Sequence, residues 1–187
     1  MPVSVIPFKM PAPLEIPAHL VSMLGQLPPD QAVLRGMELL LQIDAAEVMV
    51  YERIGEGGIL ELAGVVCREA SQAAGIQELL QREEFYGRPL SSEGDSLANR
   101  AFAQGSALLV MGQVQEGEEA PLPARLQELV LAPGGHIGFV YVLPLIGEGT
   151  RPLGALTLIR PAAAGPLNHE QPGLAEGMRQ VLSRILG

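Results

Sequence analysis

The chain has 187 residues, of which 48% are hydrophobic and 18% charged, so it predicts one packed globular domain rather than a disordered chain. Its 12 Lys and Arg residues against 21 Asp and Glu give a net charge of −9, which repels nucleic-acid phosphates and anionic lipid. Because the basic residues are scattered and Lys9 is the only lysine, we expect no nucleic-acid partner and no membrane partner. A single Cys excludes an intrachain disulfide, and three widely spaced histidines offer no ligand pair, so we predict no metal site and a reducing, cytoplasmic location.

One uncharged run, from Leu129 to Gly147, is long enough to span a bilayer. The turn residues Pro133-Gly134-Gly135 lie inside this run and would break a single helix. The N-terminus also lacks the basic region and apolar run of a signal peptide. The sequence therefore predicts a helix end, a turn and a buried strand here, with no membrane segment.

Residues 1–17 carry prolines at positions 2, 7, 11, 13 and 17, a pattern that favours extended or polyproline-like backbone. We expect this segment to be an N-terminal extension lying against the surface of a single domain that spans residues 18–187.

Within that domain, the spacing of apolar residues predicts alternating groups of helices and strands. Three helices are predicted at residues 19–27, 71–83 and 122–131. Three more are predicted from their end signals: one that Asp30 caps, a short one that begins at Gly94-Asp95-Ser96 and ends at Gly105, and a terminal helix that Asn168 caps. The predicted strands are residues 46–54, 59–67, 107–111, 137–146 and 153–160, with glycine-rich turns at 55–58 and 147–152 that make two hairpins. This order predicts an α+β domain with one antiparallel sheet.

Three segments in this order resemble a GAF domain, a small-ligand sensory module related to PAS domains. They are Glu38 to Glu52 (helix end and first strand), Gly94 to Val110 (short helix, glycine and strand), and Val142 to Leu158 (strand, proline, turn, glycine and strand). The resemblance covers residues 18–186. It implies that the N- and C-terminal helices pack on one face of the sheet, while short helices and loops cover a ligand pocket on the other.

The polar and aromatic residues that fall near the implied pocket are candidate ligand contacts. They are Cys67, Tyr86, Arg88, Ser96, Asn99, Arg100, His136, Phe139, Tyr141 and Thr157. Alternation places Phe139 and Tyr141 on one face of their strand. We assign that face to the pocket because a tyrosyl hydroxyl and a ring edge suit a small organic ligand, with core packing as the alternative.

Cofactor chemistry is not expected. Some GAF proteins carry bilin on a cysteine or reduce free methionine sulfoxide, but Cys67 lacks both the bilin surroundings and a second cysteine to resolve an oxidised intermediate. Glu93 and Asp95 place negative charge where a cyclic nucleotide would need the opposite. His136, alone in a turn, is weak support for haem.

The terminal helix carries apolar residues at nearly heptad spacing, which favours a homodimer seam, although a core stripe would have the same pattern. The residues of the predicted seam are Leu174, Met178, Val181, Leu182 and Ile185.

Together these features predict a standalone, bacterial-type, non-enzymatic sensory domain that binds a small molecule. Because no output segment is recognised, we expect it to signal through its terminal helices to a separate protein partner. Two alternatives remain: a scaffolding dimer whose pocket is filled by its own side chains, and a redox enzyme that uses Cys67.

Overall fold

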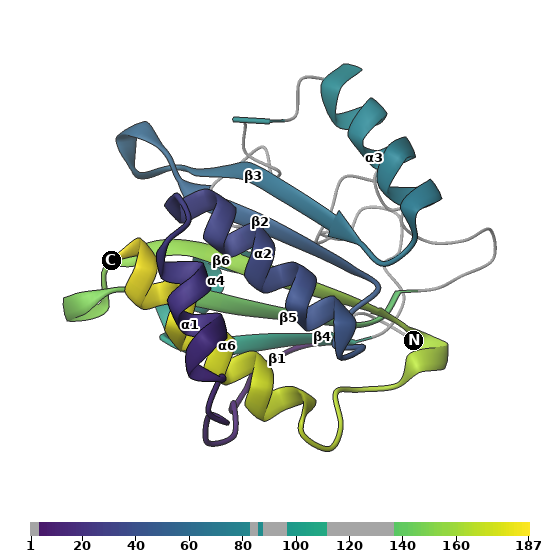
Figure 1. Ribbon diagram of the computed structural model, residues 1–187. Coiled ribbons are helices and arrows are strands. Elements are labelled where there is room, and N and C mark those ends of the chain that lie inside the picture. Colours follow the sequence, from purple (N-terminus) through teal and green to yellow (C-terminus); the bar gives the residue numbers. More distant parts are fainter. Residues whose placement is uncertain (1–3, 83–85, 88–96, 112–136) are drawn as a thin grey trace.

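The computed structural model describes residues 4–82, 86–87, 97–111 and 137–187. Its centre is a six-stranded antiparallel sheet with the strand order β1-β4-β5-β6-β2-β3 (Figure 1). The strands are β1 (Ser4–Phe8), β2 (Val48–Ile54), β3 (Leu60–Cys67), β4 (Ala107–Met111), β5 (Ile137–Ile146) and β6 (Pro152–Pro161). The two predicted hairpins, β2–β3 and β5–β6, are confirmed, and each turn is a single turn of 3₁₀ helix.

Three helices cover one face of this sheet: α1 (Ala18–Gly25), α2 (Pro29–Gln42) and α6 (Gln171–Leu186) (Figure 1). The other face packs against α3 (Ala70–Arg82) and α4 (Leu97–Gln104). The predicted α+β architecture, with the two terminal helical regions together on one face, is therefore confirmed. The helix predicted at 122–131 lies outside the described residues.

The N-terminal segment belongs to the sheet, which the sequence analysis did not predict. Strand β1 pairs antiparallel with β4, from Ser4 opposite Met111 to Phe8 opposite Ala107. Pro7 lacks the N–H of a ladder residue, and this hides the strand signal, although proline is tolerated on an edge strand. The chain then crosses α6, where the Leu14 N–H donates to the Gly173 carbonyl at 3.0 Å.

Apolar side chains form one cluster on each face of the sheet. We call the side packed against α1, α2 and α6 the α6 face, and the side packed against α3 and α4 the α4 face. Alternation divides the strands between them, so that β2 sends Met49 and Tyr51 to the α6 face and Val48 and Val50 to the α4 face.

The stripe predicted as a dimer seam lies mostly in the core of the α6 face. Met178, Val181 and Leu182 are 2%, 5% and 0% exposed within the single chain. Helix α2 approaches them closely at Gly36, where a β-carbon would lie 3.0 Å from Leu182. For these three residues the seam prediction is corrected: a helix that packs on both a sheet and a neighbouring helix requires the same apolar spacing. Leu174 and Ile185 are half-buried at the edges of the stripe.

Candidate functional site

The two aromatic residues that the sequence analysis assigned to the pocket lie instead on the α6 face. Tyr141 is buried, its ring meets Phe8 edge to face at 5.1 Å, and Phe139 packs against the same cluster. The Tyr141 hydroxyl accepts a 3.0 Å hydrogen bond from the Leu167 N–H. The pocket assignment was therefore wrong for this pair, and the alternative of core packing with a satisfied hydroxyl describes Tyr141. Alternation shows which residues share a face, but not which helices cover that face.

The α4 face carries two buried polar side chains, Glu52 on β2 and Thr157 on β6, in an otherwise apolar floor. Glu52 is 7% exposed and lies opposite Ala155, while Thr157 is 5% exposed and lies opposite Val50. Residues directly opposite in an antiparallel pair point to the same side, so both polar groups face α4 with their apolar partners. They are diagonal neighbours on adjacent strands.

Neither the Glu52 carboxyl nor the Thr157 hydroxyl has a hydrogen-bond or ion-pair partner among the described residues. Burial raises the pKa of Glu52 to about 7, since desolvation disfavours the carboxylate. Near neutral pH this carboxyl therefore exists in both forms, and it can donate or accept a hydrogen bond. Buried polar groups in proteins are nearly always paired, so an unpaired carboxyl in an apolar floor makes this face a candidate binding site.

Helix α4 belongs to the apolar cluster of this face through Leu97, Ala98 and Ala101, and the strands that it contacts are β5 and β4. Two predicted contacts, Asn99 and Arg100, lie on the same helix, with Asn99 exposed and Arg100 half-buried. Asn99 borders a cavity of about 670 Å³ at the end of the sheet.

The same cavity is bordered by Asp30, which the sequence analysis expected to cap α2. Helix α2 instead begins at Pro29, and the Asp30 carboxylate accepts hydrogen bonds from the Tyr51 hydroxyl at 3.0 Å and from Arg53 at 2.6 Å. Burial, together with the nearby Asp30 charge, raises the pKa of Tyr51 above its ordinary value. These partners satisfy one another, so the cluster ties α2 to β2.

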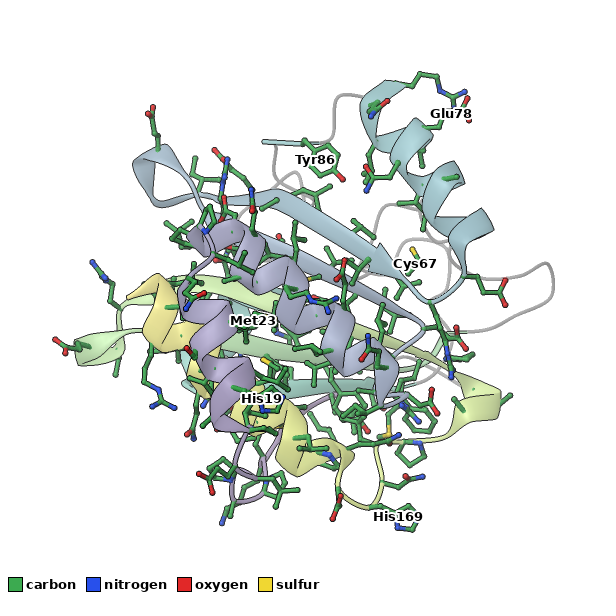
Figure 2. All side chains as sticks on the ribbon, in the orientation of Figure 1. His19, Met23, Cys67, Glu78, Tyr86 and His169 are labelled. Carbon is green, nitrogen blue, oxygen red and sulfur yellow. The ribbon has the colours of Figure 1, made fainter. Side chains whose placement is uncertain are left out.

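Cys67 and Tyr86 lie on the side of β3 that faces α3, at different positions along the strand (Figure 2). Burial raises the pKa of the half-buried Cys67 thiol to about 11, which leaves it protonated at neutral pH. The Tyr86 hydroxyl donates to Gln77 of α3 at 3.0 Å, and burial raises its pKa. The neighbouring Gly87 N–H donates to the carbonyl of Leu62, the residue opposite Glu52, so this turn reaches the Glu52 end of β3.

The structure therefore brings Thr157 and Cys67 to the α4 face and places Tyr86 beside it. Arg88, Ser96 and His136 lie outside the described residues. Among the residues that the structure describes, no cluster of His, Cys, Asp and Glu could hold a metal ion.

The sequence analysis missed Glu52, although a signal was present. Val48, Val50 and Glu52 alternate along one strand, so a carboxyl at the third position had to share the face of two buried valines. A charged residue in phase with a buried apolar row is a cue for a site.

This geometry defines an α+β domain with a GAF-like fold. No protein-family model matches the sequence, and no curated protein matches it either. Among solved structures, a GAF domain/HD domain protein from Geobacter sulfurreducens superimposes with a TM-score of 0.59 at 14% identity, covering 86% of this chain and 93% of that one. The GAF domain region of a membrane protein from the same species gives 0.55 at 19% identity, covering 88% and 96%.

A third similar structure is an enzyme, the free methionine-R-sulfoxide reductase from Neisseria meningitidis in complex with its substrate. It gives a TM-score of 0.55 at 13% identity and covers 89% of this chain and 83% of that one. Because the same fold occurs in GAF domains of other proteins and in an enzyme, the fold alone does not decide activity. In the described part of the chain, no helix is long and apolar enough to cross a membrane.

Proposed function

We propose that this protein is a non-enzymatic sensory domain that binds a small molecule on the α4 face. The observation that carries the proposal is the buried and unpartnered Glu52 carboxyl, with the Thr157 hydroxyl beside it, in an apolar floor. The ligand presents a hydrogen-bond donor, such as an amine or amide N–H, to Glu52, and its apolar body contacts the surrounding valines. A few polar groups set in a mostly apolar wall are typical of small-molecule sites.

A signalling route to a separate partner is part of the proposal. The strands that carry Glu52 and Thr157 also carry Tyr51 and Leu158 on their other side, where α2 and α6 pack. A ligand that shifts β2 against β6 would therefore change the packing of the terminal helices.

The homodimer also remains a proposal, with a revised surface. Since Met178, Val181 and Leu182 are buried, a dimer would use the half-buried Leu174 and Ile185 together with the outer side of α1.

The redox alternative at Cys67 has less support. With a pKa near 11, only about one thiol in ten thousand is ionised at pH 7, and the thiolate is the reactive form. The chain contains no second cysteine to resolve a sulfenic acid.

Native mass spectrometry of the purified chain tests ligand binding, followed by thermal unfolding with free amino acids, polyamines and nucleosides. We expect a small adduct or a saturable rise in the unfolding midpoint, which Glu52→Gln reduces strongly. Glu78→Gln is the matched control, because Glu78 is exposed on α3 and has no ion pair among the described residues (Figure 2). Absence of any adduct and of any saturable stabilisation would favour the scaffolding alternative, and equal effects of the two substitutions would remove Glu52 from the site.

A further inference from the structure

A second cavity lies where the C-terminal half of α6 meets the turn between β5 and β6, two segments that are neighbours near the end of the chain (Figure 1). Its volume is about 690 Å³, and three arginines line it: Arg151 from the turn, and Arg179 and Arg184 from α6. None of the ligand contacts predicted from the sequence borders this cavity.

The three arginines differ in what they contact. Arg179 is fixed, because its Nε and Nη2 groups donate to the Glu176 carboxylate at 2.7 and 2.6 Å and its Nη1 donates to the Pro144 carbonyl. Arg151 and Arg184 have no acidic partner in the described part of the chain, and Arg184 makes one 3.3 Å bond from Nε to the Gln180 carbonyl.

The described arginines fall into two groups, those with an acidic partner and those without one. Arg35, Arg53 and Arg68 each pair with at least one carboxylate, as a chain with a net charge of −9 allows. At the cavity, Glu148 and Gly187, the last residue of the printed sequence, line the wall beside the guanidinium groups of Arg151 and Arg184, which no described side chain neutralises.

Ser183, which also lines this cavity, gives an independent indication. It is 7% exposed, and its Oγ is buried without a hydrogen-bond partner. A buried hydroxyl without a partner is costly and calls for an explanation. An acceptor atom that reached this hydroxyl from the cavity would supply the missing hydrogen bond.

We propose that this cavity binds a small organic anion through a carboxylate or phosphate group, held by Arg151 and Arg184 and by the hydroxyl of Ser183. Guanidinium groups present forked donors that match both oxyanions, and charge-assisted hydrogen bonds of this kind are strong. The site is separate from the α4 face, where the Glu52 carboxyl would repel an anion. Its walls are α6 and the β5–β6 turn, so an occupied site would hold the terminal helix against the sheet.

The test is titration of the full chain with inorganic phosphate and with citrate at constant ionic strength, followed by backbone NMR shifts of α6 and the turn. We expect saturable shifts there, and the tighter of the two probes identifies the preferred oxyanion. Arg151→Gln and Arg184→Gln should each raise the dissociation constant about tenfold, the usual cost of a lost charged hydrogen bond. Glu148→Gln should lower it, because a repelling carboxylate is removed.

Arg82→Gln is the matched control, since Arg82 is an exposed arginine of α3 without an ion pair in the described residues. The dissociation constant of the anion should be the same for this variant as for the unchanged protein. Ser183→Ala should weaken anion binding while raising the unfolding midpoint of the free protein, because the unpaired hydroxyl is gone. A raised midpoint with unchanged binding would remove Ser183 from the site. Non-saturable shifts, or equal losses in Arg82→Gln and Arg184→Gln, would overturn the proposal and leave only general salt effects.

Discussion

The two faces of one sheet differ in whether the buried polar side chains of its strands have hydrogen-bond partners. On the α6 face, the Tyr141 hydroxyl accepts from Leu167, the Tyr51 hydroxyl donates to Asp30, and the Arg160 guanidinium donates to three backbone carbonyls. On the α4 face, Glu52 and Thr157 are equally buried but have no partner in the described residues. The first pattern is explained by folding alone. The second is the observation on which the proposed ligand site of the α4 face depends.

The largest expected change in the free energy of unfolding comes from shortening a buried leucine on each face of the sheet. Leu158→Ala on the α6 face should lower the free energy of unfolding by about 4 kcal/mol, and Leu62→Ala on the α4 face by about 2 kcal/mol. Both leucines are buried, but Leu62 lies on the edge strand β3, where neighbours can relax into the space. Urea unfolding of the two variants checks this. A loss at Leu62 as large as that at Leu158 would show that the α4 face is packed as rigidly as the α6 face.

The second prediction concerns Glu52 and pH. Its pKa is about 7 in the folded protein and near 4.5 in the unfolded chain, so the folded state binds the proton more tightly. Its contribution to stability is therefore complete below pH 4.5 and is lost as pH rises through 7, by about 3 kcal/mol between pH 4 and pH 8. Glu52→Gln should remove this pH dependence and be the more stable protein at pH 8. Parallel pH profiles of urea unfolding for the two proteins would mean that Glu52 is solvated or paired.

A third prediction compares two buried hydroxyls. Tyr141→Phe leaves the Leu167 N–H without its acceptor and should cost about 1–3 kcal/mol of unfolding free energy without affecting ligand binding. Thr157→Val removes a hydroxyl that has no partner, so it should leave stability unchanged or slightly higher while weakening ligand binding. Thermal unfolding with and without ligand measures both. If Thr157→Val is the more destabilising change, the hydroxyl already has a partner in the free protein and the contrast between the faces is lost.

The smallest expected change in the free energy of unfolding concerns the packing of residues 12–16 against the outer side of α6. A β-carbon at Gly177 would overlap the Leu14 carbonyl, so Gly177→Ala should cost about 1 kcal/mol overall despite the better helix propensity of alanine. Gly25→Ala, where no atom lies within 4 Å, is the control and should be neutral or stabilising. Hydrogen exchange of residues 12–16 should accelerate only in the first variant. Unchanged exchange there would show that this segment does not depend on its contact with α6.

The strands, the hairpins and the face that carries Glu52 could be predicted from the sequence. Alternation of apolar residues located β2 to β6, and glycine-rich turns located both hairpins, because these signals are local. The same alternation could have identified Glu52 from Val48 and Val50. The orientation of Tyr141 could not be deduced, because it depends on which helices pack against which face, and that is set by contacts far apart in the sequence.

Two further errors have the same physical origin. The spacing of Met178, Val181 and Leu182 fits a dimer seam and a core stripe equally well, and only the position of α2 distinguishes them. Strand β1 was missed because Pro7 hides its local pattern, so that only its pairing with β4, about a hundred residues later in the chain, identifies it as a strand.

That separation has a consequence for how the protein is made. Strand β1 is synthesised about a hundred residues before its partner β4, and Leu14 long before its partner Gly173 on α6. Both segments therefore leave the ribosome well before the elements that they pair with. Until the segment around Leu14 packs against α6, Gly173 and Gly177 are exposed to water. Packing of this segment therefore covers the outer side of α6 after the helix itself has formed.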